Sequence, residues 1–118
     1  MAEPTLLTIT VDDRGAEGAP VVVAVVGQLD FGTTPRLLAA ATPAAASGRA
    51  VLLDLSELSF CDSSGLSALV RLHKAAAAAG GSLSLARPRP QVAATIAATA
   101  LDRLFTITDE LPEPDQPR

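Results

Sequence analysis

The residues best suited to chemistry lie in the stretch CDSSG, residues 61–65, between an apolar strand-like run and an apolar helix-like run. A thiol, a carboxylate and two hydroxyls are groups used in nucleophilic catalysis, helix capping and phosphorylation. Asp62 or Ser63 is a good helix cap, worth about 1 kcal/mol. Capping does not account for Ser64 or for Gly65, since glycine in a helix costs about 1 kcal/mol relative to alanine. We therefore expect close approach to the bare backbone of Gly65, which a binding partner would supply.

Catalysis by these groups would need a base, and His73 is the only histidine in the chain. It follows Ser63 by ten residues on one predicted helix, a rise of about 15 Å, which is far beyond hydrogen-bond reach. One histidine and one cysteine also make a poor metal site, and neither GxxxxGK[ST] nor GxGxxG occurs. We expect no enzyme activity, no metal and no cofactor. His73 is interpreted as a semi-buried core residue and Cys61 as a small buried apolar one.

The composition of the 118 residues fits a single domain with an aliphatic core, since 48% are hydrophobic and only 3% are aromatic. The net charge is −4, with no basic patch, so nucleic acid is not an expected partner. The single cysteine excludes an intrachain disulfide and suits a reducing compartment. No signal peptide is recognised, and no apolar run approaches the roughly 18 residues of a membrane span. We expect a soluble cytoplasmic protein with no membrane partner.

The elements that must position these residues alternate between strand and helix patterns. Strands are predicted over residues 6–11, 21–27, 50–56, 82–86 and 104–108, and helices from Thr34 onward, from residue 62 or 63 to about 79, and from Pro90 onward. Thr34 followed by Pro35 is a typical helix start, and Pro43 is expected to bend or end that helix early. The nearly continuous apolar run 21–27 suits a strand buried on both faces. The order is β-β-α-β-α-β-α-β.

This order predicts an α/β fold, a small sandwich in which helices pack on a mixed, mostly parallel sheet of about four to five strands. The first two strands form an antiparallel hairpin, and strands 21–27 and 50–55 are expected to be parallel. The carboxyl ends of parallel strands lie at the same edge, where such sheets carry functional loops. We therefore expect the loop with Asp30 to lie near Asp62, Ser63 and Ser64.

Three segments carry a resemblance to a known family. They are VLLDLSELSFCDSSGLSALV (51–70), VVGQLDFGT (25–33) and TALDRLFTI (99–107). Together they closely resemble the STAS domain of bacterial anti-sigma factor antagonists, over residues 5–108. The resemblance implies a STAS-like sandwich. Residues 109–118, rich in proline and acids, are predicted to be a disordered tail.

The resemblance implies a partner switch. Members of the family bind, when unphosphorylated, an anti-sigma factor that is also a GHKL-type serine kinase, and thereby free a sigma factor. The kinase phosphorylates a serine of the DSSG motif, which prevents binding, and a PP2C-type phosphatase reverses this. The motif match implies Ser63 as the acceptor and Asp30 as a partner contact. Separately from the resemblance, we expect the protein to be monomeric when free.

A helical wheel gives a different ranking of the two serines. On the wheel Ser64 lies on the polar face with Ser67 and Arg71, whereas Ser63 lies nearer the apolar edge. The wheel alone favours Ser64 as the acceptor, and we keep Ser63 because the first turn of a helix opens to solvent. The expected partner surface comprises Asp30, Asp62, Ser63, Ser64, Gly65, Ser67 and Arg71.

Two alternatives and one departure from the family pattern remain open at this point. The chain could serve as a STAS docking module in a stress-signalling or lipid-transport complex, with DSSG unmodified, or as a nucleotide-sensing STAS domain. Ala100 stands where relatives often have glycine. If that position is left-handed, alanine costs about 1 kcal/mol there.

Overall fold

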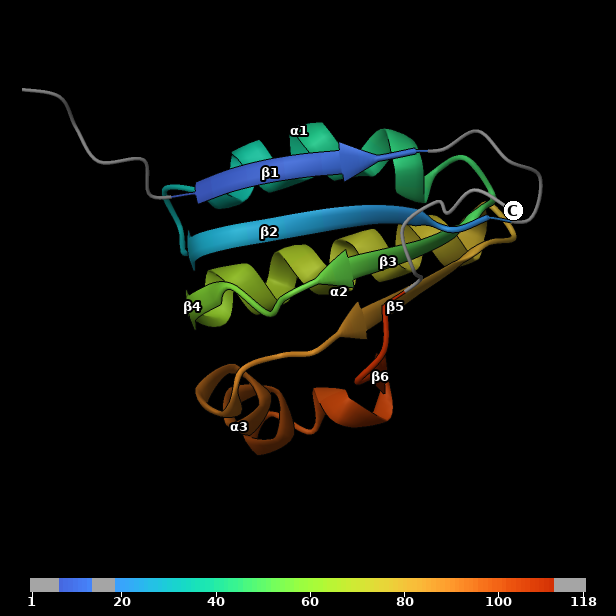
Figure 1. The fold of residues 1–118 in the computed structure, drawn as a ribbon. Coiled ribbons are helices and arrows are strands. Elements are labelled where there is room, and N and C mark those ends of the chain that lie inside the picture. The colour runs from blue at the N-terminus through green and yellow to red at the C-terminus, as the bar shows by residue number, and fades with distance from the viewer. Residues whose placement is uncertain (1–6, 14–18, 112–118) are drawn as a thin grey trace, which may run out of the picture.

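Strands and helices alternate along most of the chain, as a computed structural model that describes residues 7–13 and 19–111 shows (Figure 1). The elements are β1 (Leu7–Asp12), β2 (Val21–Leu29), α1 (Thr34–Ala45), β3 (Ala50–Asp54), β4 (Leu58–Cys61), α2 (Ser63–Ala78), β5 (Ser82–Ala86), α3 (Pro90–Ala98), the 3₁₀ turn η1 (Leu101–Arg103) and β6 (Thr106–Thr108). Within these described ranges, no helix is long and apolar enough to cross a membrane. The predicted α/β class and order are confirmed, with one additional strand, β4.

The strands form one mixed sheet in the order β1-β2-β3-β5-β6. β1 and β2 pair antiparallel, with Leu7 opposite Gly27, and the other pairs are parallel. β4 pairs with β2 at Gly27–Leu29, beyond the stretch Val21–Ala24 that pairs with β3. On the side of α3, the Gln91 side-chain amide donates a hydrogen bond of 2.6 Å to the Ser59 carbonyl of β4. β4 therefore extends the sheet at the edge where β2 ends.

The core lies between the sheet and the helices α1 and α2, which run side by side behind it in Figure 1. The strand residues on this face are aliphatic and buried, as Val23, Val25, Leu53 and Leu85 illustrate. The residues that alternate with them in β2 are only half-buried. The prediction that β2 is buried on both faces is therefore wrong, because α3 lies at the edge of the sheet, below β5 in Figure 1, and covers little of the second face.

The helix boundaries follow local sequence with two differences. The N-cap residue of α1 is Thr33, one residue before the predicted cap and without a side-chain capping bond, and the helix continues through Pro43 to Ala45. The expected early end does not occur because Pro43 lies in the last turn and the fully buried Ala45 anchors that turn to the core. At the end of α2, the Gly81 and Gly80 N–H groups donate to the carbonyls of Ala76 and Ala77. These bonds form the Schellman stop that the glycine pair predicts.

Part of the predicted tail and part of the loop between β1 and β2 lie outside the described residues. Residues 112–118 of the predicted disordered tail lie outside the described ranges, as do residues 14–18 of the first loop. Of the tail, residues 109–111 are described, and the Glu110 N–H donates to the Thr108 hydroxyl at 3.1 Å.

Candidate functional site

The loop after β2 and the start of α2 meet at the carboxyl edge of the sheet, as the topology predicts. β4 aligns Cys61 with Leu29 in the parallel ladder. Directly afterwards, the Asp62 N–H donates to the Leu29 carbonyl at 3.2 Å. Asp30, which follows β2, and Asp62, which follows β4 and precedes Ser63, therefore lie at this junction. Strand pairing fixes both in place.

Asp62 caps α2 and presents Ser63 as the first residue of the helix. The Asp62 backbone is extended, with φ −95° and ψ −171°, and its Oδ1 accepts a hydrogen bond of 3.0 Å from the Gly65 N–H. Ser63 is exposed, whereas Ser64 is half-buried. The wheel therefore ranks the exposure of the two serines wrongly, because Ser63 is the first residue of α2 and lies at its open end. Judged by exposure alone, Ser63 is more accessible to a kinase than Ser64.

Gly65 is buried against the protein's own core, and no partner is needed to account for it. A Cβ at this position would lie 2.7 Å from the Cys61 Sγ and 2.9 Å from both the Leu29 Cγ and the Leu29 carbonyl oxygen. The expectation of a close approach is confirmed, but the approaching groups are internal. The structure therefore corrects the assignment of Gly65 to the partner surface.

The Asp30 side chain organises its own loop. Its Oδ1 accepts hydrogen bonds from the N–H groups of Gly32 at 2.9 Å and Thr33 at 3.1 Å. Thr33, 4% exposed, donates through its hydroxyl to the Gln28 carbonyl at 2.9 Å and accepts from the Asp30 N–H at 2.9 Å. The loop is therefore braced from within, and this internal role alone would account for an aspartate at position 30.

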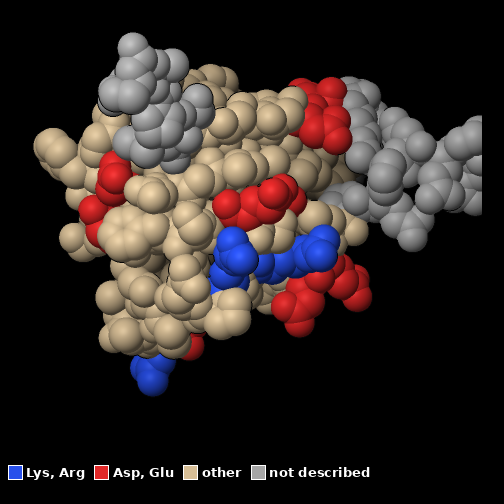
Figure 2. Space-filling model, turned by 60° about the vertical axis from the view of Figure 1, so that its left-hand side comes forward, with Lys and Arg blue, Asp and Glu red and all other residues tan. Residues whose placement is uncertain are grey.

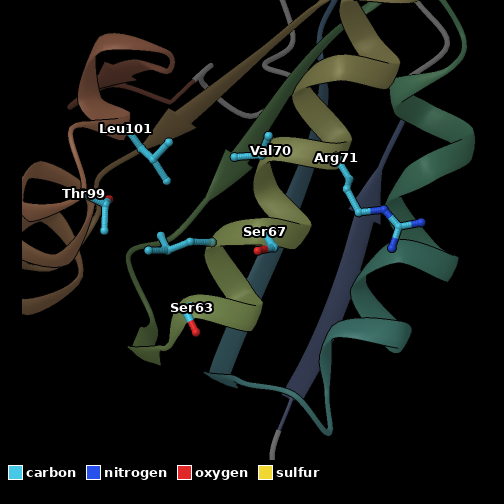
Figure 3. A pocket seen from close by; sticks show the side chains of 7 residues that line it. Ser63, Ser67, Val70, Arg71, Thr99 and Leu101 are labelled. Carbon is cyan, nitrogen blue, oxygen red and sulfur yellow. The ribbon is translucent and has the colours of Figure 1, made fainter.

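An open groove of about 470 Å³ begins at Ser63 and follows α2 (Figure 3). Its lining residues are Ser63, Leu66, Ser67, Val70 and Arg71 from α2, and Thr99 and Leu101 from the far wall. Ala100, between the two wall residues, has the left-handed conformation considered for it above, with φ 61° and ψ 15°. The groove floor is aliphatic, and Figure 3 shows the Arg71 side chain pointing away from Thr99 and Leu101.

The structure brings together three of the predicted site residues in this groove, namely Ser63, Ser67 and Arg71. All three are exposed, whereas Ser64 does not line the groove. The far wall was not predicted from sequence. Its residues, Thr99 and Leu101, stand on either side of the left-handed Ala100, and the one sequence signal for them is the departure from glycine at that position.

Cys61 and His73 have the structural roles expected of them. Burial, with a smaller contribution from the neighbouring Asp62 charge, raises the pKa of the Cys61 thiol to about 12. The thiol is therefore a weak nucleophile at neutral pH. His73 is half-buried and packs edge-on against the Phe105 ring, with centroids 5.8 Å apart. It lies on the same helix as Ser63, ten residues away, so the two side chains cannot form a catalytic pair.

Comparison with known proteins gives the family. The model of the STAS domain matches residues 10–113, and the chain belongs to this family. A crystal structure of an anti-sigma factor antagonist from Mycobacterium paratuberculosis is 28% identical, with a TM-score of 0.76 over 94% of this chain and 92% of that one. The recognised resemblance is thereby confirmed at the level of family and fold.

Two further similar structures show the same fold in two covalent states. The anti-sigma factor antagonist SpoIIAA in its unphosphorylated form is 23% identical, with a TM-score of 0.65 over 87% of this chain and 90% of that one. The Bacillus cell fate determinant SpoIIAA in the phosphorylated form is 21% identical, with the same TM-score over 87% of this chain and 93% of that one.

Proposed function

We propose that this chain is an anti-sigma factor antagonist controlled by phosphorylation of Ser63. In this proposal the unphosphorylated form binds an anti-sigma factor that is also a GHKL-type serine kinase, and the bound sigma factor is released. Phosphorylation of Ser63 prevents binding, and a PP2C-type phosphatase restores it. The likeness to the mycobacterial antagonist supports the general role. The observation that carries the proposal is the exposed Ser63 hydroxyl at the start of α2.

The geometry around Ser63 suits a kinase substrate. The hydroxyl is exposed on a first turn held by the Asp62 cap and by the Asp62–Leu29 bond. A kinase can therefore reach the hydroxyl without unfolding the helix. The groove beside it offers an aliphatic surface on which a partner can pack, with Ser67 and Arg71 at its rim.

The expected effect of a phosphate is electrostatic. A phosphoserine adds about −1.5 to −2 charges at neutral pH. The first-turn N–H groups and the helix dipole favour it by about 0.3–1 kcal/mol, while the adjacent Asp62 carboxylate opposes it. These opposing contributions are small, so we expect little structural change. A partner that covers this edge without a matching cation would lose about 3 kcal/mol or more, a hundredfold or more in affinity.

Intact-mass measurement with peptide mapping tests the proposal. The protein is incubated with ATP and, one at a time, the GHKL-type kinases encoded by its source organism, beside Ser63→Ala and Ser64→Ala. We expect the gain of one phosphate in wild type and in Ser64→Ala, and none in Ser63→Ala. The phosphorylated protein is then tested for binding to the same kinase in the presence of ADP, where we expect at least a hundredfold loss.

Other outcomes separate the parts of the proposal. Loss of the phosphate only in Ser64→Ala would keep the switch and move the acceptor by one residue. A phosphate on Ser63 with no loss of affinity would refute the release mechanism. The absence of phosphate with every candidate kinase would favour the docking-module alternative, in which Ser63 serves as part of an unmodified contact surface.

A further inference from the structure

Phe31 is the most exposed large hydrophobic side chain of the described residues. The chain has three phenylalanines, and they differ sharply: Phe105 is 4% exposed, Phe60 48% and Phe31 81%. A single exposed apolar side chain is common on protein surfaces. What distinguishes Phe31 is the loop that carries it and the place where that loop lies.

The loop holds Phe31 outward without using its side chain. The hydrogen bonds that shape residues 28–33 come from the Asp30 carboxylate, the Thr33 hydroxyl and backbone groups. The Thr33 and Thr34 N–H groups also both donate to the Asp30 carbonyl, at 3.1 and 2.9 Å. A polar residue at position 31 would leave all of these bonds in place. The fold therefore does not require an aromatic ring here, and the ring is presented on a pre-organised loop, which lowers the entropy cost of binding.

The loop lies directly beside the proposed phosphorylation site. The Leu29 carbonyl, two residues before Phe31, accepts the Asp62 N–H, one residue before Ser63. Figure 3 shows α3 on one side of α2 and α1 on the other, so the groove flanks Ser63 on one side and the loop leading to α1 flanks it on the other. A partner that covers Ser63 thus meets Phe31 and the groove together.

The charges next to Phe31 restrict what can pack against it. Asp30 and Asp62 both lie at this edge, and the nearest basic side chain on α1, Arg36, is turned to the Leu7 carbonyl at 3.1 Å. Figure 2, which brings this edge forward, shows acidic side chains at its left, in its centre and at its right, whereas the Lys and Arg side chains lie in the middle and lower parts of the view. An apolar pocket bordered by a basic side chain is the complementary surface.

On the basis of the proposed function, we propose that Phe31 is the aromatic anchor of this protein, filling an apolar pocket of the anti-sigma factor beside the Ser63 contact. Aromatic residues are enriched among the few side chains that dominate binding at protein interfaces. In this proposal Phe31 contributes binding free energy to the complex, whereas phosphorylation of Ser63 prevents the complex from forming.

Binding measurements on matched phenylalanine variants test this proposal. Wild type, Phe31→Ala, Phe31→Leu and Phe60→Ala are titrated calorimetrically against the purified GHKL-type kinases of the source organism with ADP, and thermal melting of each variant is recorded. We expect Phe31→Ala to weaken binding by about 30-fold or more, which corresponds to about 2 kcal/mol. Phe31→Leu should retain most of the affinity and Phe60→Ala nearly all of it. Melting of the Phe31 variants should match wild type.

The outcomes distinguish this inference from the function on which it rests. Wild-type binding with no loss in Phe31→Ala would overturn the anchor and leave the antagonist function standing. An equal loss in Phe60→Ala, or a lowered melting temperature in Phe31→Ala, would also overturn it, because the ring would then serve a general apolar surface or the fold. Failure of wild type to bind any of these kinases would overturn both proposals.

Discussion

Replacing Gly65 by alanine sets two physical effects against each other. Alanine is the better helix former and should stabilise α2 by up to about 1 kcal/mol. The added Cβ, however, would stand 2.7 Å from the Cys61 Sγ and 2.9 Å from the Leu29 carbonyl oxygen. Distances this short require neighbours to move. The sign of the change in stability therefore reports whether the junction between α2 and the sheet can yield.

The junction has little freedom to yield. The Leu29 side chain is fully buried, and its carbonyl accepts the Asp62 N–H, so a shift of this carbonyl weakens the bond that fixes the start of α2. Overpacking of a filled core costs about 1–3 kcal/mol, and loss of one hydrogen bond adds about 1 kcal/mol. After the gain in helix propensity, we expect Gly65→Ala to destabilise the protein by about 1–3 kcal/mol.

Denaturant unfolding followed by circular dichroism measures this change. Ser67→Ala is the matched control, since it adds helix propensity at an exposed position of the same helix and should be neutral or slightly stabilising. Combining Gly65→Ala with Cys61→Ala removes the sulfur contact but leaves the carbonyl contact, so it should recover only part of the loss. If Gly65→Ala proved as stable as wild type, the steric reasoning would be refuted.

Two further predictions concern backbone strain and a buried thiol. Ala100→Gly relieves a left-handed alanine (φ 61°) and should raise the free energy of unfolding by about 1 kcal/mol. Ala98→Gly, in the last turn of α3, should lower it. Equal effects of the two substitutions in denaturant unfolding would contradict the inference that the backbone of Ala100 is strained. Because the Cys61 pKa is raised from 9.0 to about 12, the folded protein keeps a proton that the unfolded chain loses. Wild type should therefore lose stability relative to Cys61→Ala as the pH rises from about 9 toward 12, and parallel pH profiles would refute this.

The features that the sequence predicts well are those with local causes. Alternating and continuous apolar runs locate most of the strands, and the Gly80–Gly81 stop and Pro90 start follow from backbone preferences. β4 was not predicted because four residues carry little periodicity, and its pairing with β2 depends on where β3 ends. The apolar run of β2 likewise does not reveal that only one face is covered.

The sequence predicted which residues belong to the candidate site better than it predicted which of them are exposed and what they contact. The DSSG motif identified Ser63, but a wheel misjudged exposure, since it assumes an ideal helix lying flat on a core. Gly65 was correctly expected to meet close neighbours, yet whether these are internal or external is a tertiary property. Phe31 carries no sequence signal, because nothing local distinguishes an aromatic ring in a loop that folds inward from one that is held in solvent.

The bond from Gln91 to β4 also has a consequence for self-association. A strand edge with unpaired carbonyls is a template on which a second chain can add a strand. At the Ser59 carbonyl this position is already taken, by a side-chain amide 2.6 Å away. An incoming strand must therefore displace the Gln91 side chain before it can extend the sheet at this end. Gln91, in the first turn of α3, thus occupies a carbonyl of β4 through which a second copy of the chain could otherwise extend the sheet.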